Sequence, residues 1–93
     1  MLQTMAAAAH PGTLKWLTHD LLLATLDWVN VMTYDMSGPW SNVTGFRAPL
    51  YDSQPNPPEG TSADTTLQAI LALGVPADKL VMGVPFYGGG WSN

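Results

Sequence analysis

A phenol and a carboxylate stand next to each other where an apolar run ends. Residues 28–40 read WVNVMTYDMSGPW, so that Tyr34 and Asp35 close an apolar stretch and a turn carrying Trp40 follows them. A hydroxyl and a carboxylate side by side can hydrogen-bond a neutral polar ligand, and an indole can stack on a sugar ring. These residue types favour carbohydrate recognition. The alternative is a buried strand whose last two side chains only cap a loop.

A strand must present these side chains at one of its ends. Strands that are buried on both faces of a parallel sheet read as continuous apolar runs, and sites form at their carboxyl ends. We therefore expect a strand over residues 28–34. Its alternation predicts that Asn30, Met32 and Tyr34 share one face, with Asp35 at the edge of that face.

The remaining segments predict an α/β fold. Residues 2–8 favour a short buried strand, residues 13–26 an interrupted helix, and residues 80–87 a second buried strand. Residues 61–64 offer an N-cap for an amphipathic helix that stops at Gly74. The order of strands and helices predicts a parallel sheet of about three strands with crossover helices. Such a sheet leaves open edges, which the rest of a larger sheet or self-association would have to cover.

Composition and charge exclude several classes of function. The 93 residues suffice for at most one small domain, and 46 % of them are apolar. A net charge of −4 with only three scattered basic residues argues against nucleic acid and anionic membranes as partners. No apolar run matches a membrane span or a signal peptide, so the localisation stays unknown. There is no cysteine, and His10 and His19 lack partners at metal spacing, so we expect neither a metal nor a cofactor.

Two long segments together resemble the family 18 glycoside hydrolases, the chitinases. Residues 27–40 (DWVNVMTYDMSGPW) are similar to the sixth strand of that family and the loop after it. Residues 74–88 (GVPADKLVMGVPFYG) are similar to the approach to the seventh strand and to that strand. Residues 42–51 resemble the intervening loop, and residues 2–12, more weakly, the fifth strand. The resemblance implies that residues 1–93 are a fragment of a catalytic domain, a partial (β/α)8 TIM barrel.

The resemblance also implies a reaction and a substrate. Enzymes of this family hydrolyse β-1,4-linked N-acetylglucosamine polymers with retention, using the acetamido group of the substrate as the nucleophile. Chitin or a chito-oligosaccharide is the implied partner. Tyr34 would donate a hydrogen bond to the acetamido oxygen in the −1 subsite, and Asp35 would bind sugar hydroxyls there. Trp40 would stack on the aglycone side, Tyr87 would contact the −1 sugar, and Met32 would line the floor unless it is a plain barrel-core residue.

The chain departs from the family pattern in two places. The acidic signature Asp-x-x-Asp-x-Asp-x-Glu is absent, and the only glutamate, Glu59, lies in a Pro-rich loop with no burial to raise its pKa. The family often has Tyr-Gly-Arg where this chain has Tyr87, Gly88 and Gly89, so a cation that binds sugar and orients Asp35 is expected to be missing.

Three hypotheses follow from this pattern. The first is a fragment of a chitinase-like hydrolase, of a family that is often secreted, which is inactive in isolation because the acid is absent. The second is a non-catalytic chitin-binding, lectin-like protein that retains Tyr34, Asp35 and Trp40. The third is a truncated gene product without a function of its own. Whether the chain itself is an enzyme stays open at this point.

Overall fold

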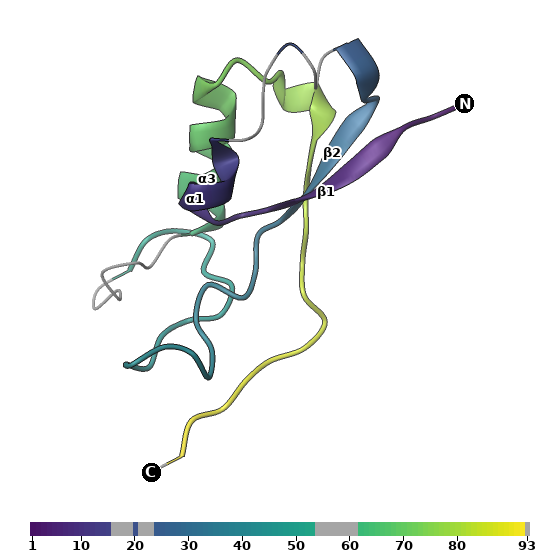
Figure 1. The fold of residues 1–93 in the computed structure, drawn as a ribbon. Helices are drawn as coiled ribbons and strands as arrows, with labels where there is room; N and C mark the ends of the chain where they lie inside the picture. The colour runs from purple at the N-terminus through teal and green to yellow at the C-terminus, as the bar shows by residue number, and fades with distance from the viewer. Residues whose placement is uncertain (16–19, 21–23, 54–61, 93) are drawn as a thin grey trace.

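Three parallel strands in the order β1-β2-β3 form the centre of the fold (Figure 1). The computed structural model describes residues 1–15, 20, 24–53 and 62–92. The strands are β1 (Thr4–Ala8), β2 (Trp28–Met32) and β3 (Leu80–Met82). The described helices are α1 (Pro11–Leu14), α3 (Ala63–Ala72) and the 3₁₀ helix η1 (Ala77–Lys79). The parallel pairing confirms the predicted α/β fold class, a part of a TIM-barrel-type sheet.

Helix α3 begins and ends where the sequence predicts. The Ser62 hydroxyl accepts a hydrogen bond from the Thr65 amide at 3.1 Å, which satisfies one of the free amides of the first turn. Gly74 follows the last turn with a φ of 95°, a conformation that glycine adopts without a steric penalty. Between these ends, Ala63, Thr66 and Ile70 are buried at helical spacing.

Replacing Ser62 with alanine is expected to lower the free energy of unfolding by about 1 kcal/mol, because the cap and its buried hydroxyl are lost together. Urea unfolding followed by circular dichroism measures the effect. Gln68→Ala, on the exposed side of α3, is the matched control and should change the midpoint little. Equal effects of the two substitutions would contradict a role of the cap.

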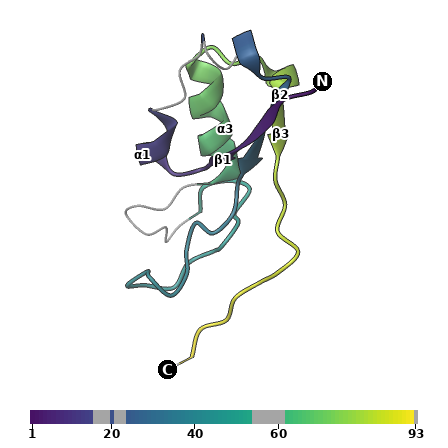
Figure 2. The same cartoon turned by 45° about the vertical axis from the view of Figure 1, so that its right-hand side comes forward.

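The core lies between the helices and one face of the sheet. Val29 and Val31 of β2 pack with Leu14 of α1, Ile70 of α3 and Val75. Figure 2 shows both helices on this side of the sheet. Thr33 is buried on the same face, whereas Asn30, Met32 and Tyr34 alternate with these residues and are half-buried. The predicted period-2 alternation of this strand is therefore confirmed.

All three strands are shorter than the sequence predicts. β1 begins at Thr4; Leu2 is exposed, and Ala7 is the strand's one fully buried residue. β2 ends at Met32, because the amides of Thr33 and Tyr34 donate to the carbonyls two residues earlier and so leave the ladder.

The prediction that residues 80–87 form a buried strand is wrong in length and in burial. β3 ends at Met82, and Val81 and Met82 are both exposed. The strand occupies an outer position in the described sheet, so one of its edges has no neighbouring strand among the described residues. Val81 and Met82 point to opposite faces of this strand, Met82 to the face of Val31 and Val81 to the face of Asn30. Apolar character alone therefore did not decide burial.

Two predicted segments fall partly outside the described residues. Of the helix expected over residues 13–26, α1 accounts for the start and residues 24–25 are helical, while residues 16–19 and 21–23 are not described. Glu59, the only glutamate of the chain, also lies outside the described residues. No described helix is long and apolar enough to span a membrane.

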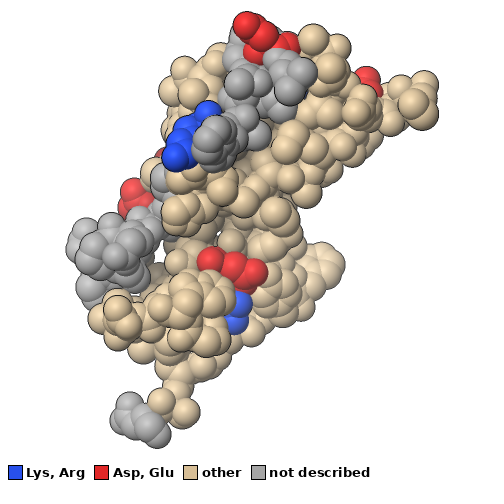
Figure 3. Space-filling model, viewed as in Figure 1, with Lys and Arg blue, Asp and Glu red and all other residues tan. Residues whose placement is uncertain are grey.

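The chain after β3 extends away from the sheet (Figure 1). The radius of gyration is 14.2 Å, above the value of about 12 Å expected for a compact domain of this length. Charged side chains are sparse on the face that Figure 3 shows. The extended segment carries Tyr87 past the carboxyl end of β2, where the candidate site lies.

Candidate functional site

The chain turns sharply as it leaves β2. After the two local hydrogen bonds of Thr33 and Tyr34, Asp35 adopts a φ of 58°, in the left-handed region that Asp and Asn tolerate better than most residues. The turn directs the Asp35 side chain away from the strand at the sheet's carboxyl end. The site therefore begins with a non-glycine residue in a costly backbone conformation.

A close approach of two backbones brings the segment after β3 to this turn. The Gly83 amide donates to the Val31 carbonyl at 2.8 Å, and the Thr33 hydroxyl donates to the Gly83 carbonyl at 2.7 Å. A Cβ on Gly83 would lie 2.7 Å from the Val31 oxygen and 2.9 Å from the Tyr34 ring, so no side chain fits there. These hydrogen bonds hold the segment after β3 alongside β2 beyond the ends of both strands and bring Tyr87 beside Tyr34.

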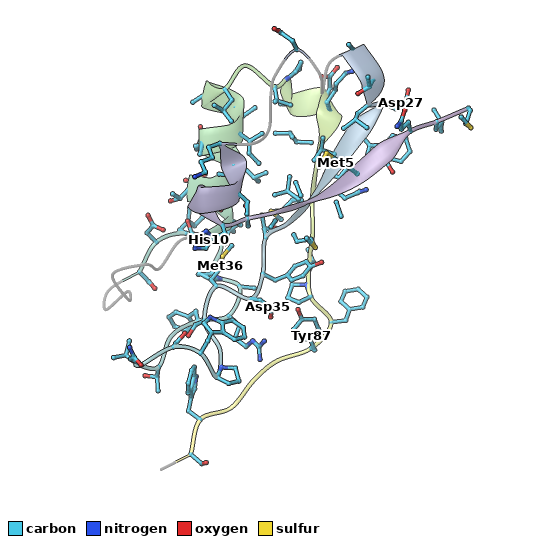
Figure 4. All side chains as sticks on the ribbon, in the orientation of Figure 1. Met5, His10, Asp27, Asp35, Met36 and Tyr87 are labelled. Atoms are coloured by element: carbon cyan, nitrogen blue, oxygen red, sulfur yellow. The ribbon has the colours of Figure 1, made fainter. Side chains whose placement is uncertain are left out.

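Asp35 accepts hydrogen bonds at both of its carboxylate oxygens. Arg47 Nη2 lies 2.6 Å from Oδ1, and the Tyr87 hydroxyl donates to Oδ2 at 2.8 Å. Figure 4 shows the Asp35 and Tyr87 side chains directed toward one another from the two segments. The rings of Tyr34 and Tyr87 meet edge to face, with centroids 6.2 Å apart. Arg47 and Tyr87 thus meet at the Asp35 carboxylate, and Tyr34 joins them through its ring contact with Tyr87.

This geometry shifts two pKa values. Hydrogen bonds from Arg47 and then from Tyr87 hold the pKa of the Asp35 carboxyl below its ordinary value. The hydrogen bond to the same carboxylate raises the pKa of the Tyr87 phenol above its ordinary value. At neutral pH the pair is therefore an ionised acceptor and a protonated donor, which is the state that can orient a neutral polar ligand.

The Asp35 shift predicts a pH dependence. Because the folded-state pKa is depressed, the contribution of Asp35 to stability is present above its unfolded-state pKa and is lost as the pH falls through the folded-state pKa. Carboxyl carbon chemical shifts followed by NMR should give an Asp35 midpoint below that in urea-unfolded protein. The same midpoint in both states would contradict the arrangement.

Arg47 and the aromatic side chains form a continuous wall next to the carboxylate. The Arg47 guanidinium carbon lies 5.9 Å from the Trp40 ring centroid and 5.6 Å from that of Tyr87, within cation–π range. Trp40 itself is 63 % exposed, so its ring is open to a ligand. Beside this wall lies a cavity of about 210 Å³, which is lined by residues 38–39, Arg47 and residues 89–92.

The structure brings four of the five predicted site residues together. Tyr34, Asp35 and Tyr87 are in direct contact, and Arg47 connects them to Trp40. Met32 lies on the same face of β2 as Tyr34, two residues earlier in the chain, and does not line the cavity. Asp27, by contrast, lies just before β2, where its Oδ2 accepts from the amide of Gln3, the residue before β1.

The expectation that no cation orients Asp35 is wrong. Residue 89 is indeed glycine, but Arg47 reaches Asp35 from the loop that follows Asp35 in the sequence. Sequence reasoning missed this residue because its partner lies 12 positions away in a different loop. The available signal was that Arg47 is the only arginine of the chain and lies in the loop that follows the Tyr34–Asp35 pair.

Comparison with known proteins identifies the family. The family model described as glycosyl hydrolases family 18 matches residues 1–93, the whole chain. The chain belongs to glycoside hydrolase family 18. Among curated relatives, it is 42 % identical over 89 residues to Chitinase 1 of Aphanocladium album.

Solved structures of the same family superimpose closely. A variant of catalytic domain 2 of the Group II chitinase of Ostrinia furnacalis, in complex with penta-N-acetylchitooctaose (NAG)5, matches 92 % of this chain with a TM-score of 0.84 and 32 % identity. The family 18 chitinase of Cycas revoluta, in complex with (GlcNAc)3, matches 90 % with a TM-score of 0.74 and 38 % identity.

The family 18 chain is short beside its relatives. The alignment with Chitinase 1 covers 94 % of this chain but only 21 % of the length of Chitinase 1. The chain likewise spans 23 % of the Ostrinia furnacalis chain and 24 % of the Cycas revoluta chain. The described residues therefore correspond to about a quarter or less of a family 18 catalytic chain.

Proposed function

We propose that residues 1–93 form part of the barrel of a chitinase and supply part of its substrate-binding wall. The observation that carries this proposal is the meeting of Tyr34, Asp35 and Tyr87 at the carboxyl end of a parallel sheet, beside the exposed ring of Trp40. Membership of family 18 and similarity to structures solved with (GlcNAc)3 and (NAG)5 support a chito-oligosaccharide as the ligand.

The reaction proposed for the complete enzyme is substrate-assisted hydrolysis with retention. The acetamido oxygen of the −1 sugar attacks the anomeric carbon while the glycosidic bond breaks and an acid protonates the leaving oxygen. An oxazolinium-type intermediate forms, and water then attacks the anomeric carbon from the face that the leaving group vacated, which releases the acetamido oxygen and retains the configuration. The protein therefore has to orient the acetamide, offer a proton and stabilise developing positive charge.

Each side chain of the cluster has a place in this scheme. The Tyr34 hydroxyl donates to the acetamido oxygen, and the Asp35 carboxylate accepts from sugar hydroxyls and stabilises positive charge. Tyr87 contacts the −1 sugar while it holds Asp35. Trp40 stacks on the aglycone side, and Met32 lies below on the floor. No metal or other cofactor is needed for these steps.

The proton donor is proposed to come from outside these 93 residues. The acidic signature of the family is absent from the sequence, and Glu59 lies in a Pro-rich loop. The exposed apolar side chains of β3 and of the segment after it support a neighbouring strand on that side; among them are Val81, Met82, Val84 and Phe86. Self-association of the chain would cover the same surface.

Comparison of the 93-residue chain with the full-length protein tests the proposal. By full-length protein we mean the product of the complete open reading frame that contains these residues. The purified 93-residue chain is expected to release no product from chitotetraose. The full-length protein is expected to cleave it and to release the β-anomer first, as measured by ¹H NMR.

Other outcomes select the other hypotheses. Turnover by the 93-residue chain would show that the acid lies within it. Binding without cleavage, with a substituted residue in place of the upstream glutamate, would identify a chitin-binding lectin-like protein. An open reading frame that contains only these residues would leave a truncated gene product and overturn the proposal.

A further inference from the structure

One guanidinium connects Asp35, Trp40 and Tyr87. Arg47 pairs with Asp35 at 2.6 Å and lies within 6 Å of the ring centroids of both Trp40 and Tyr87. These partners belong to three segments: the turn after β2, the loop that follows it, and the chain after β3. In the described structure, Arg47 is the one side chain that reaches all three partners.

The main chain around Arg47 is held by the rest of the fold. Its carbonyl accepts from the Met36 amide at 2.8 Å, directly beside Asp35 in the sequence. Two residues further on, the carbonyls of Pro49 and Leu50 accept from the first amides of α3 at 2.9 and 3.0 Å. Arg47 therefore projects from a base that is fixed both to the β2 turn and to a helix.

Part of the Arg47 side chain is buried without compensation. Its Nε has no solvent access and no hydrogen-bond partner among the described residues. An unpaired buried donor is unfavourable, so the contacts at the other end of the guanidinium have to offset this cost. The ion pair with Asp35 and the two rings are those contacts.

Gly89 supplies the space that Arg47 occupies. A Cβ on Gly89 would lie 2.7 Å from Arg47 Nη1 and 2.8 Å from Arg47 Cδ, both closer than real Cβ atoms come. Gly89 does not need to be glycine for its backbone, because its φ lies outside the left-handed region. Its neighbours Gly88 and Gly90 would meet nothing within 4 Å. Within this glycine run, only the middle position has its Cβ space occupied, and a side chain there would have to displace Arg47.

We propose that Arg47 is the positioning residue of this site and that Gly89 is required because Arg47 fills the space beside it. Arg47 fixes the direction of the Asp35 carboxylate and the separation of the Trp40 and Tyr87 rings. The inference rests on the proposed function, since it assigns Arg47 a role in the same sugar-binding wall.

Four variants of the full-length protein test the role of Arg47 itself. Arg47→Ala is expected to raise the Asp35 pKa, measured by carboxyl ¹³C NMR, and to lower kcat/KM by about 10- to 100-fold, the range for a misplacement of up to about 1 Å. Arg47→Lys should recover only part of the lowered Asp35 pKa and of kcat/KM, since an ammonium lacks the planar fork of the guanidinium. Gly89→Ala should shift both readouts in the Arg47→Ala direction by displacing the guanidinium. Gly88→Ala is the matched control and should change neither.

A rescue experiment separates positioning from loss of fold. In the double variant Arg47→Ala with Gly89→Arg, position 89 supplies a guanidinium next to the space that the Arg47 side chain occupied. The Asp35 pKa is expected to be lower in this double variant than in Arg47→Ala. An Asp35 pKa that does not change in Arg47→Ala would overturn the inference, as would equal effects of Gly89→Ala and Gly88→Ala. If the wild-type protein does not cleave chitotetraose, the proposed function fails, but the Asp35 titrations still decide the role of Arg47.

Discussion

Replacing Asp35 with Asn in the full-length protein is expected to lower kcat/KM on chitotetraose by about 10³-fold, the upper range for removing a preorganised electrostatic group. Asp35 accepts from Arg47 at one oxygen and from Tyr87 at the other. Asparagine has only one acceptor oxygen, so its amide group would face either the guanidinium or the phenol. The substitution removes the negative charge and one of the two acceptor oxygens together.

The control for this prediction is Asp78→Asn, which removes an exposed carboxylate from the 3₁₀ helix η1, a separate element at the opposite end of β3. It should leave kcat/KM within about twofold, as expected of a surface substitution. Thermal melts of both variants check that the fold is retained. If Asp35→Asn retained wild-type kcat/KM with an unchanged melt, Asp35 would have no part in the reaction.

Helix α3 and the faces of β2 were predictable because their signals are local. Ser62 and Gly74 satisfy the helix ends through atoms within a few residues of themselves. The alternation of Val29 and Val31 with Asn30 and Met32 depends only on strand geometry. Such features need no knowledge of distant parts of the chain.

The burial of β3 was not predictable in this way. Leu80, Val81 and Met82 read as a buried apolar run, but burial requires an element on the other side. Val81, in register with Asn30, has no element over its face among the described residues. Met82, in register with Val31, lies at the open edge of the described sheet, so both are exposed. An apolar run therefore indicates what a strand is suited to contact, whereas its exposure depends on what the remaining chain supplies.

The connection between Arg47 and Gly89 is also invisible in the sequence pattern. The two residues lie in different loops, and neither loop has a periodicity that would bring them together. Gly89 alone suggested a lost cation, because the arginine expected there is absent. Only the positions of Arg47 Nη1 and Cδ against residue 89 show that the cation comes from the other loop.

Tyr34→Phe in the full-length protein is expected to lower kcat/KM by about 10²-fold, the loss expected when a reacting atom is misplaced by about 1 Å. The ring contact with Tyr87, at 6.2 Å and 82° between planes, needs no hydroxyl, so phenylalanine keeps the packing and loses only the donor. Because the Tyr34 hydroxyl positions the acetamido oxygen for its attack on the anomeric carbon, kcat should fall more than KM rises.

Two further substitutions test whether the loss of activity in Tyr34→Phe comes from the Tyr34 hydroxyl itself. Tyr51→Phe removes a hydroxyl from an exposed tyrosine of the following loop and should leave both constants nearly unchanged. Tyr87→Phe removes a donor to Asp35 and should raise the Asp35 pKa, whereas Tyr34→Phe should not, because its hydroxyl acts on the substrate rather than on the carboxylate. A Tyr34→Phe enzyme with wild-type kcat would refute the acetamide contact. One that lost activity only together with a shift of the Asp35 pKa would show that Tyr34 acts through Asp35 instead.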